Sequence, residues 1–208
     1  MLFKDRKDAG RILAASLLKY KKSPKTVVVG LPRGGVVVAA VVAEELGLPL
    51  DVIVPRKIGA PDNPELAIGA LAGDTVYLDK GLIDHLGVSE THIKNAILRE
   101  KMEAQRRFSL FRKGKGTQDW TGMTVIVVDD GIATGSTMRV SVEYLRKCKA
   151  KRIIVAVPVG PLETLSEIEK LADEVVCPFT PASFFAVGQF YESFPQTQDE
   201  EVILLLEK

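Results

Sequence analysis

The sequence predicts an α/β fold: a parallel sheet core flanked by helices, with an inserted subdomain. Short apolar runs rich in valine and isoleucine recur along the 208 residues, and helical patterns lie between them. The runs are continuously apolar rather than alternating, which is typical of strands in a sheet that is covered on both faces. Repeated strand–helix–strand units indicate parallel strands joined by right-handed crossovers. One segment, residues 56–122, breaks this alternation and is too long for a plain connection.

The elements of the core can be assigned in order. An amphipathic pattern around Ala9–Tyr20 predicts a helix packed on the core. The predicted strands are Thr26–Gly30, Leu50–Pro55, Thr124–Asp129, Arg152–Pro158 and Asp173–Cys177. The predicted helices between them are Val36–Leu46, Ser136–Lys147 and Leu162–Leu171.

The long segment that breaks the alternation has elements of its own. It contains a hairpin pattern at Ala67–Leu71 and Val76–Leu78, then a long polar helix over about Ser89–Phe111. We interpret residues 60–118 as a lid or hood inserted over one end of the sheet, and residues 178–208 as a C-terminal hood segment. No linker or repeat divides the chain, so residues 1–208 are expected to form a single domain.

Composition limits the class of protein. A net charge of +1 and 46% hydrophobic residues argue against disorder and against a protein that mainly coats nucleic acid. Cys148 and Cys177 fit no metal-ligand spacing, which favours a reduced, cytoplasmic protein. His85 and His92 lie in a polar region and are expected on the solvated surface. No signal peptide and no run of membrane-spanning length is recognised.

The third strand ends in chemistry-bearing residues. In an open parallel sheet, ligands bind beyond the carboxyl ends of the strands. There Asp129 and Asp130 are followed by the loop GIATGST at 131–137, which leads into a helix. Glycines let the backbone approach a ligand, and the free N–H groups of a helix start attract anions. The loop therefore predicts a phosphate cradle, and the acids suit sugar hydroxyls or a hydrated Mg²⁺.

Other phosphate motifs fit this loop less well. A P-loop requires GxxxxGK[ST], and this loop has no lysine. A dinucleotide fingerprint requires GxGxxG, which neither residues 30–35 nor residues 131–136 supply. A purely structural interpretation, in which the acids cap the loop and the glycines turn it, stays open at this point.

Two further strand ends carry positive charge. The first strand ends in GLPRGG at 30–35, where Gly34 and Gly35 expose backbone N–H groups beside Arg33. The second ends in PRKIG at 55–59, with the adjacent cations Arg56 and Lys57. Taken alone, the first loop is equally well explained as a simple turn, and a solvated basic pair stays open as the less favoured alternative for the second. Together with the phosphate cradle they suit a second, more highly charged anion such as a diphosphate.

The ligand that combines these parts is 5-phosphoribosyl 1-diphosphate (PRPP) with Mg²⁺. The stretch VIVVDDGIATGST at 125–137 is similar to the PRPP-binding motif of the type I phosphoribosyltransferases. Nearly the whole chain resembles a bacterial group of this family whose acceptor substrate is not assigned. The segments that carry this resemblance are PRGG, RKIGAPDNPELAIGA, VDDGIATGSTMR, VPVGP and FFAVGQFYESF.

The resemblance implies roles for the matching residues. Asp129 and Asp130 would hold the ribose hydroxyls and the Mg²⁺ that accompanies the ligand. Arg33 to Gly35 would form the diphosphate loop, where the family often carries a cis peptide bond. Arg56 and Lys57 would meet the same diphosphate. The 5-phosphate would be bound by Gly131, Ile132, Ala133, Thr134, Gly135, Ser136 and Thr137.

The implied activity is Mg-dependent transfer of the 5-phosphoribosyl group from PRPP to a nitrogen nucleophile such as a nucleobase, with release of diphosphate. A homodimer is expected on family grounds. In the hypoxanthine–guanine branch an aspartate of the PRPP loop serves the purine, and Ala133 stands at that position here. This departure disfavours a 6-oxopurine acceptor.

Three groups of residues have no role that the pattern decides. Glu65, Glu100 and Glu103 lie in the predicted lid, where charged surface is the better interpretation than a general base. The basic stretch Arg99–Lys115 is better explained as a solvated helix face than as an RNA site. The C-terminal aromatics are expected to be core rather than a stacking platform for a base; they are Phe179, Phe184, Phe185, Phe190, Tyr191 and Phe194.

The alternative to an enzyme is a non-catalytic regulator that senses PRPP or a nucleotide. Such regulators often keep the PRPP loop and lose the residues on the diphosphate side. Arg33, Arg56 and Lys57 are present here, which favours the enzyme. A third hypothesis, a phosphatase or hydrolase that uses the aspartate pair, lacks a second cluster of metal ligands.

Overall fold

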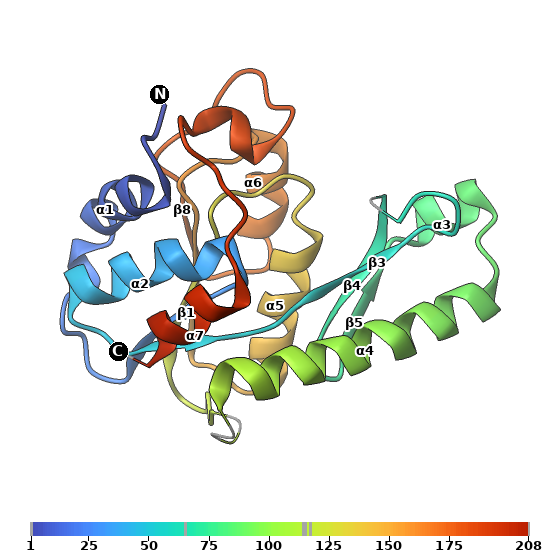
Figure 1. The fold of residues 1–208 in the computed structure, drawn as a ribbon, viewed down its shortest axis with the longest axis horizontal. Helices are drawn as coiled ribbons and strands as arrows, with labels where there is room; N and C mark the ends of the chain where they lie inside the picture. Colours follow the sequence, from blue (N-terminus) through green and yellow to red (C-terminus); the bar gives the residue numbers. More distant parts are fainter. Residues whose placement is uncertain (1, 65, 114–115, 117, 208) are drawn as a thin grey trace.

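The centre of the molecule is a sheet of five parallel strands (Figure 1). The computed structural model describes residues 2–64, 66–113, 116 and 118–207. In spatial order the strands are β2 (Leu50–Val52), β1 (Thr26–Gly30), β6 (Thr124–Val128), β7 (Arg152–Ala156) and β8 (Glu174–Val176). Each strand runs parallel to its neighbours. The predicted α/β class is therefore confirmed.

Apolar side chains cover both faces of this sheet, because successive residues of a strand point to opposite sides. Ile126 of β6 faces the cluster built with α1 (Arg6–Ser16) and α2 (Gly34–Leu46). Its neighbour Val127 faces the cluster built with α5 (Ser136–Lys147) and α6 (Leu162–Glu169). This double coverage explains why the strands are continuously apolar in sequence.

The core elements follow the sequence prediction closely. Strand β1 and helix α5 have the predicted bounds. The other four strands are shorter than predicted, since residues at their ends already belong to loops. The N-terminal helix starts and ends earlier than expected, and a 3₁₀ turn at Leu18–Tyr20 follows it.

The inserted segment forms a second, antiparallel sheet with two helices. Strands β3 (Arg56–Gly59), β4 (Ala67–Ala72) and β5 (Thr75–Leu78) pair in this order, and α3 (Lys80–Leu86) and α4 (Glu90–Arg112) follow. Figure 1 shows this arm extending away from the parallel sheet. The predicted hairpin and long polar helix are both present.

One assignment within this segment is wrong. The predicted strand Leu50–Pro55, with residues 55–59 as its terminal loop, is in fact two elements. β2 ends at Val52, and Arg56 opens β3, where it pairs with Leu71 of β4. Pro55 has no N–H to donate to a ladder, so the chain changes sheet around it.

The C-terminal segment returns across the core. Phe3 forms a parallel bridge with Tyr191, and helix α7 (Asp199–Leu206) packs on α2 and α4 through Val202. The prediction omits α7 and α3, because each spans only about two turns and offers few periodic positions. Phe190 and Tyr191 are buried as expected of core aromatics, whereas Phe185 is 89% exposed.

The remaining polar markers do not gather into a separate site. Cys148 and Cys177 are free thiols. His85 is exposed as expected, whereas His92 is half-buried and its Nε2 lies 3.0 Å from the carbonyl oxygen of Gly59. Within the described ranges, no helix combines the length and apolar character that crossing a bilayer requires.

Truncating the central strand should destabilise the whole domain. Ile126 is fully buried, so Ile126→Ala should lower the free energy of unfolding by about 2–5 kcal/mol. Urea unfolding followed by circular dichroism measures this. Leu98→Ala, at a position that is 61% exposed, is the control and should change it by only about 0.5 kcal/mol. Equal losses in both variants would contradict the described core.

Candidate phosphoribosyl site

Two loops leave the carboxyl edge of the sheet side by side. Gly30, the last residue of β1, is in register with Val128, the last residue of β6. The N–H of Leu31 still donates to the carbonyl of Val128 at 2.9 Å. The loop at 31–35 and the loop at 129–137 therefore start from neighbouring points, as the prediction of a shared site required.

The first loop packs directly on the two aspartates. A Cβ added at Gly34 would lie 2.0 Å from Oδ2 of Asp130, and one added at Gly35 would lie 2.6 Å from Oδ1 of Asp129. Real Cβ atoms do not approach oxygen so closely, so only glycine fits at either position. The Pro32–Arg33 peptide bond in this loop is cis, as the family resemblance implied.

Arginine from the first helix holds one of these acids. Nε of Arg6 lies 2.7 Å from Oδ2 of Asp130, and its Nη1 donates to the carbonyl of Pro195 at 2.6 Å. The guanidinium carbon lies 3.8 Å from the ring centroid of Phe194. The hydroxyl of Tyr191 donates to the carbonyl of Asp130 at 2.5 Å. Both ends of the chain thus converge on this aspartate.

The sequence prediction misses these contacts, although one signal for them exists. Arg6 is only 9% exposed and shares the buried face of α1 with Ala9, Gly10 and Leu13. A charged residue at helical spacing from an apolar stripe is a sign of a buried ionic partner. The partner itself, 124 positions away in sequence, could not be read from the pattern.

The carboxylate pair is short of compensating charge. Burial raises the pKa of Asp129 well above its usual range, and the neighbouring charge of Asp130 raises it further. Burial also raises the pKa of Asp130, although the Arg6 guanidinium opposes this shift. Burial and the Asp130 charge likewise raise the pKa of Tyr191. Hydroxyl donors or a cation from a ligand would relieve this excess of negative charge.

The second loop presents a helix start. Gly135, at φ +77°, precedes α5, and no side chain caps the first N–H groups of that helix. Gly131 and Ile132 are buried, while Ala133 and Thr134 are exposed at the rim. Oγ1 of Thr134 lies 3.4 Å from Oγ of Ser136. Uncapped N–H groups, adjacent hydroxyls and the helix dipole make this an anion-binding geometry.

Arg33 faces the C-terminal helix. It precedes α2, which also begins without a side-chain cap. Its Nη1 lies 3.7 Å from Oδ1 of Asp199 in α7, an oxygen that is buried and accepts no hydrogen bond. This distance is that of a loose ion pair, so the guanidinium is not committed to a tight partner here.

The other predicted cations lie in the insert. Nε and Nη2 of Arg56 lie 3.0 and 2.9 Å from Oε2 of Glu100 on α4, and Lys57 is exposed on the same strand. Glu100, a candidate general base, is thus occupied by Arg56. Glu103 is likewise paired, with Arg106 and Arg107. Glu65 lies outside the described residues.

The described residues therefore sort the candidates into two groups. Asp129, Asp130 and the residues 33–35 and 131–137 gather at one edge of the sheet. Arg56 and Lys57 start the antiparallel arm instead of ending a strand of the parallel sheet. The sequence prediction of one common loop edge is met by the first group.

A methyl group added at Gly34 tests how closely this residue packs on the Asp130 carboxylate. Gly34→Ala should lower the free energy of unfolding by about 1–3 kcal/mol, because the new Cβ collides with the Asp130 carboxylate. Gly81→Ala, in helix α3 with no atom nearer than 3.6 Å, should be neutral or stabilising by up to about 1 kcal/mol. Thermal unfolding of both variants distinguishes the two cases. Tolerance of Gly34→Ala would refute the close packing.

Removing the arginine should leave a buried charge. Arg6→Leu should cost about 3–5 kcal/mol at neutral pH, as breaking a buried ion pair does. The loss should shrink in acid: with Arg6 gone, the folded pKa of Asp130 rises further, and protonation then removes the uncompensated charge. Urea unfolding across pH measures this. Arg11→Leu, exposed on the same helix, should show neither effect. A pH-independent loss would contradict the role of the pair.

The chain is similar to known phosphoribosyl transferases in sequence. Residues 3–192 match the family described as "Phosphoribosyl transferase domain". The protein named "Putative phosphoribosyl transferase Rv0571c" from Mycobacterium tuberculosis H37Rv is 45% identical over 212 residues, which cover 100% of this chain and 47% of the relative. The chain spans about half the length of this curated relative.

Two solved structures have a similar fold. TT1426 from Thermus thermophilus is 36% identical with a TM-score of 0.80, over 99% of this chain and 98% of that one. A hypoxanthine-guanine phosphoribosyltransferase from Bacillus anthracis is 15% identical with a TM-score of 0.50, over 86% and 81%, and shares the fold alone. On the family match and the extent of these similarities, the chain belongs to the phosphoribosyl transferase domain family.

Proposed function

We propose that this protein transfers the 5-phosphoribosyl group from PRPP to a nitrogen nucleophile, a nucleobase or similar compound, and releases diphosphate. The observation that carries the proposal is the edge where the uncapped start of α5 lies next to the half-buried pair Asp129 and Asp130. A phosphate at the helix start and hydroxyls at the acids are the two ends of a phosphoribosyl group.

Each part of PRPP then has a partner. The loop at 131–137 binds the 5-phosphate through backbone N–H groups and the hydroxyls of Thr134, Ser136 and Thr137. Asp129 and Asp130 accept hydrogen bonds from the ribose hydroxyls. The backbone of Gly34 and Gly35 and the side chain of Arg33 meet the diphosphate. Arg56 and Lys57 join them when the arm approaches, with Arg56 exchanging Glu100 for the ligand.

Magnesium fits this donor set. The aspartate pair supplies carboxylate oxygens, the ligand type that Mg²⁺ prefers, and its raised pKa marks negative charge that a cation would balance. Among the described residues no group of three or more acidic, histidine or cysteine side chains gathers. Asp129 and Asp130 would therefore hold only part of the coordination shell, as is usual for Mg²⁺ bound with a phosphate ligand. Bound there, the ion would neutralise charge on the departing diphosphate.

The chemistry follows from this placement. A lone pair on nitrogen forms a bond to C1 of the ribose while the bond from C1 to the diphosphate oxygen breaks, and the diphosphate leaves with that electron pair. The transition state carries positive charge on the sugar. The protein contributes by orienting the two reactants and by stabilising the leaving group with Arg33 and loop N–H groups.

We assign the inserted arm, residues 60–118, the role of a lid. Helix α4 carries few buried residues: Ala96, Ala104 and Phe111 are the buried ones among its 23 residues. The outer part of the arm packs on an apolar cluster of its own rather than on the core, so this part can move without disrupting the core. Its closure would keep water from the sugar cation.

A PRPP or nucleotide sensor on the same fold is the second candidate. The specific observation in its favour is that Arg56 is engaged by Glu100, at 2.9–3.0 Å. If this pair persists with ligand bound, the diphosphate side loses one of its cations. PRPP would then bind without turnover.

Calorimetric titration of PRPP with Mg²⁺ tests the site. The wild type should bind in the micromolar range, and Asp129→Asn/Asp130→Asn should weaken binding by at least about tenfold, since two acceptors for ribose hydroxyls are lost. Asp84→Asn, exposed on α3, is the control and should bind as the wild type does. No binding by a folded wild type would refute the assignment of this loop.

Release of diphosphate separates the enzyme from the sensor. With PRPP bound, an enzyme should release diphosphate only when a nitrogen nucleophile is supplied, which a screen of nucleobases and small amines can reveal. Binding without release for any acceptor, together with an unaltered affinity in Arg56→Ala, would favour the sensor. Release without any acceptor would indicate a hydrolase.

A further inference from the structure

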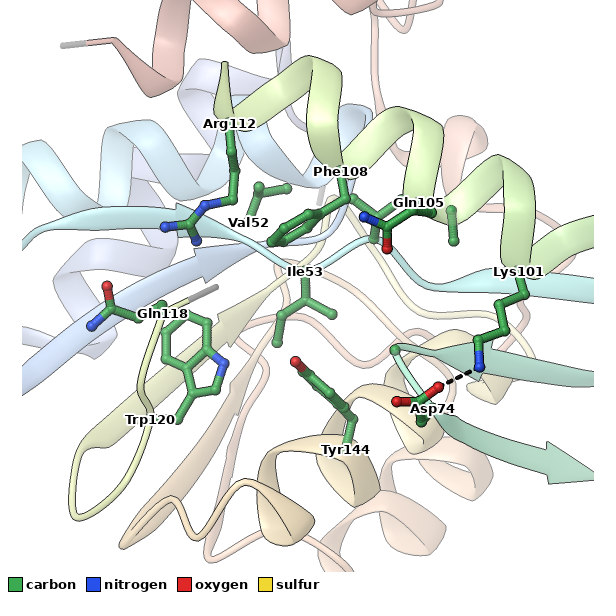
Figure 2. Close-up of a pocket in the computed structure, with 13 residues that line it drawn as sticks. Val52, Ile53, Asp74, Lys101, Gln105, Phe108, Arg112, Gln118, Trp120 and Tyr144 are labelled. Atoms are coloured by element: carbon green, nitrogen blue, oxygen red, sulfur yellow. Dashed lines mark hydrogen bonds and ion pairs between the residues drawn. The ribbon is translucent and has the colours of Figure 1, made fainter. Parts of the chain in front are cut away.

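A cavity lies away from the proposed phosphoribosyl site. It has a volume of about 210 Å³ and opens between α4, the residues after β2, the β4–β5 turn and α5 (Figure 2). None of its lining residues belongs to the loops at 30–35 or 129–137, or is Arg56 or Lys57. The role proposed above does not use this space, so it requires an explanation of its own.

Aromatic rings form the walls of this cavity. Phe108 of α4 lies on one side, and Trp120 and Tyr144 lie on the other (Figure 2). The indole of Trp120 is 3% exposed, and Ile53 closes the floor at 4%. Flat apolar walls of this kind favour a planar ring, which can stack or meet a ring edge-on.

The position of Tyr144 depends on the β4–β5 turn. A Cβ added at Gly73, whose φ is +53°, would lie 2.6 Å from Cε2 of the Tyr144 ring. The turn therefore closes over the ring and fixes it. Figure 2 shows the hydroxyl of Tyr144 pointing into the space between Ile53 and Trp120. A rigidly held polar group in an apolar cavity is a means of orienting a ligand.

The charged groups at the rim neutralise one another. Nη1 of Arg112 donates to both carboxylate oxygens of Asp51, at 2.6 and 2.7 Å. Nζ of Lys101 pairs with Oδ1 of Asp74 across the opening (Figure 2). With both cations matched by an acid, the cavity offers no excess charge to an ion. Nε of Arg112 is buried without a hydrogen-bond partner among the described residues and is a free donor for an oxygen of the ligand. A neutral ligand is favoured, because both cations of the lining are already matched by an acid.

The polar groups inside are neutral donors. Burial raises the pKa of Tyr144 to about 12, so its hydroxyl stays protonated at neutral pH. The side-chain amide of Gln105 also lines the space. A hydroxyl and an amide match a carbonyl or carboxamide group on the ligand.

We propose that this cavity binds a small neutral molecule, a single planar six-membered ring that carries a carbonyl or carboxamide group. The ring lies between Phe108 and the Trp120–Tyr144 wall, and the carbonyl accepts a hydrogen bond from the hydroxyl of Tyr144. The volume suits one substituted ring, since a cavity of about 150 Å³ already holds benzene. The ligand contacts none of the residues assigned to PRPP.

Benzamide is the probe for this site, because it is neutral and planar and has no ring nitrogen that could act as an acceptor of phosphoribose. Trp120 is the only tryptophan of the sequence, so its fluorescence reports on the cavity directly. Benzamide should change the emission saturably, with a dissociation constant of about 1 mM or below, as small one-ring ligands reach. Benzoate and toluene should each bind at least about fivefold more weakly, since one is charged and the other lacks the carbonyl.

Two variants and a control make the test specific. Ala104→Phe fills the cavity from α4 and should weaken benzamide binding at least about tenfold. Tyr144→Phe keeps the volume and should weaken benzamide about fivefold or more without changing toluene. Leu98→Phe, at an exposed position of the same helix, should bind as the wild type does.

The proposal is overturned if the wild type does not respond to benzamide, or if Leu98→Phe and Ala104→Phe bind it equally. Equal affinities for toluene and benzamide would show an apolar cavity that does not recognise the carbonyl group. Stronger binding of benzoate than of benzamide would show an anion site. Either result refutes the proposed ligand class. Should Ala104→Phe fail to fold, the comparison of benzamide with toluene in Tyr144→Phe still decides between these outcomes.

Discussion

The contact between the Gly34–Gly35 backbone and the two aspartates after β6 is the constraint on which the rest of this structure depends. Two adjacent, half-buried carboxylates are costly unless hydrogen bonds or opposite charge compensate them. The packing of glycine onto their oxygens leaves no space for water on that side. Compensation has to come from elsewhere, and Arg6 supplies part of it, at 2.7 Å from Asp130. The N-terminal helix and the segment around Tyr191 and Pro195 are thereby drawn to the same edge.

Arg6 compensates the negative charge of Asp129 and Asp130 only in part, which favours binding of a ligand. The pKa of each aspartate stays raised even with Arg6 in place. A site whose polar groups all have partners without ligand gains little from binding one. An acidic pair that lacks donors instead gains hydrogen bonds from sugar hydroxyls and charge balance from a cation. The same reasoning applies to the start of α5, whose N–H groups have no side-chain cap. Both halves of the edge thus offer groups that the proposed phosphoribosyl ligand would complete.

The antiparallel arm is attached to the molecule differently from the elements of the core. The arm follows β2 in the chain and precedes β6. Its long helix α4 covers the aromatic cavity beside Tyr144 of α5, whereas the loop at 131–137 lies at the start of α5. Sites on the core are held by continuous apolar clusters. The outer part of the arm packs on an apolar cluster of its own, whereas its base joins the core clusters through Ala70, Ala104 and Phe111. In the proposed reaction, a rigid phosphate site and a movable arm would together exclude water from the sugar.

The sequence by itself determined the parallel core, because continuous apolar runs and helical periodicity are local properties that both faces of the sheet enforce. It also predicted the place of the loop at 129–137, since two acids, glycines and hydroxyls follow a strand in adjacent residues; its role in phosphate binding stays a prediction. Only the tertiary structure decided which groups meet the acids from afar, because Arg6 and Asp130 are 124 positions apart and no local period links them. It also decided that Arg56 opens a second sheet, since strand pairing depends on a partner, β4, that the run after Pro55 does not reveal.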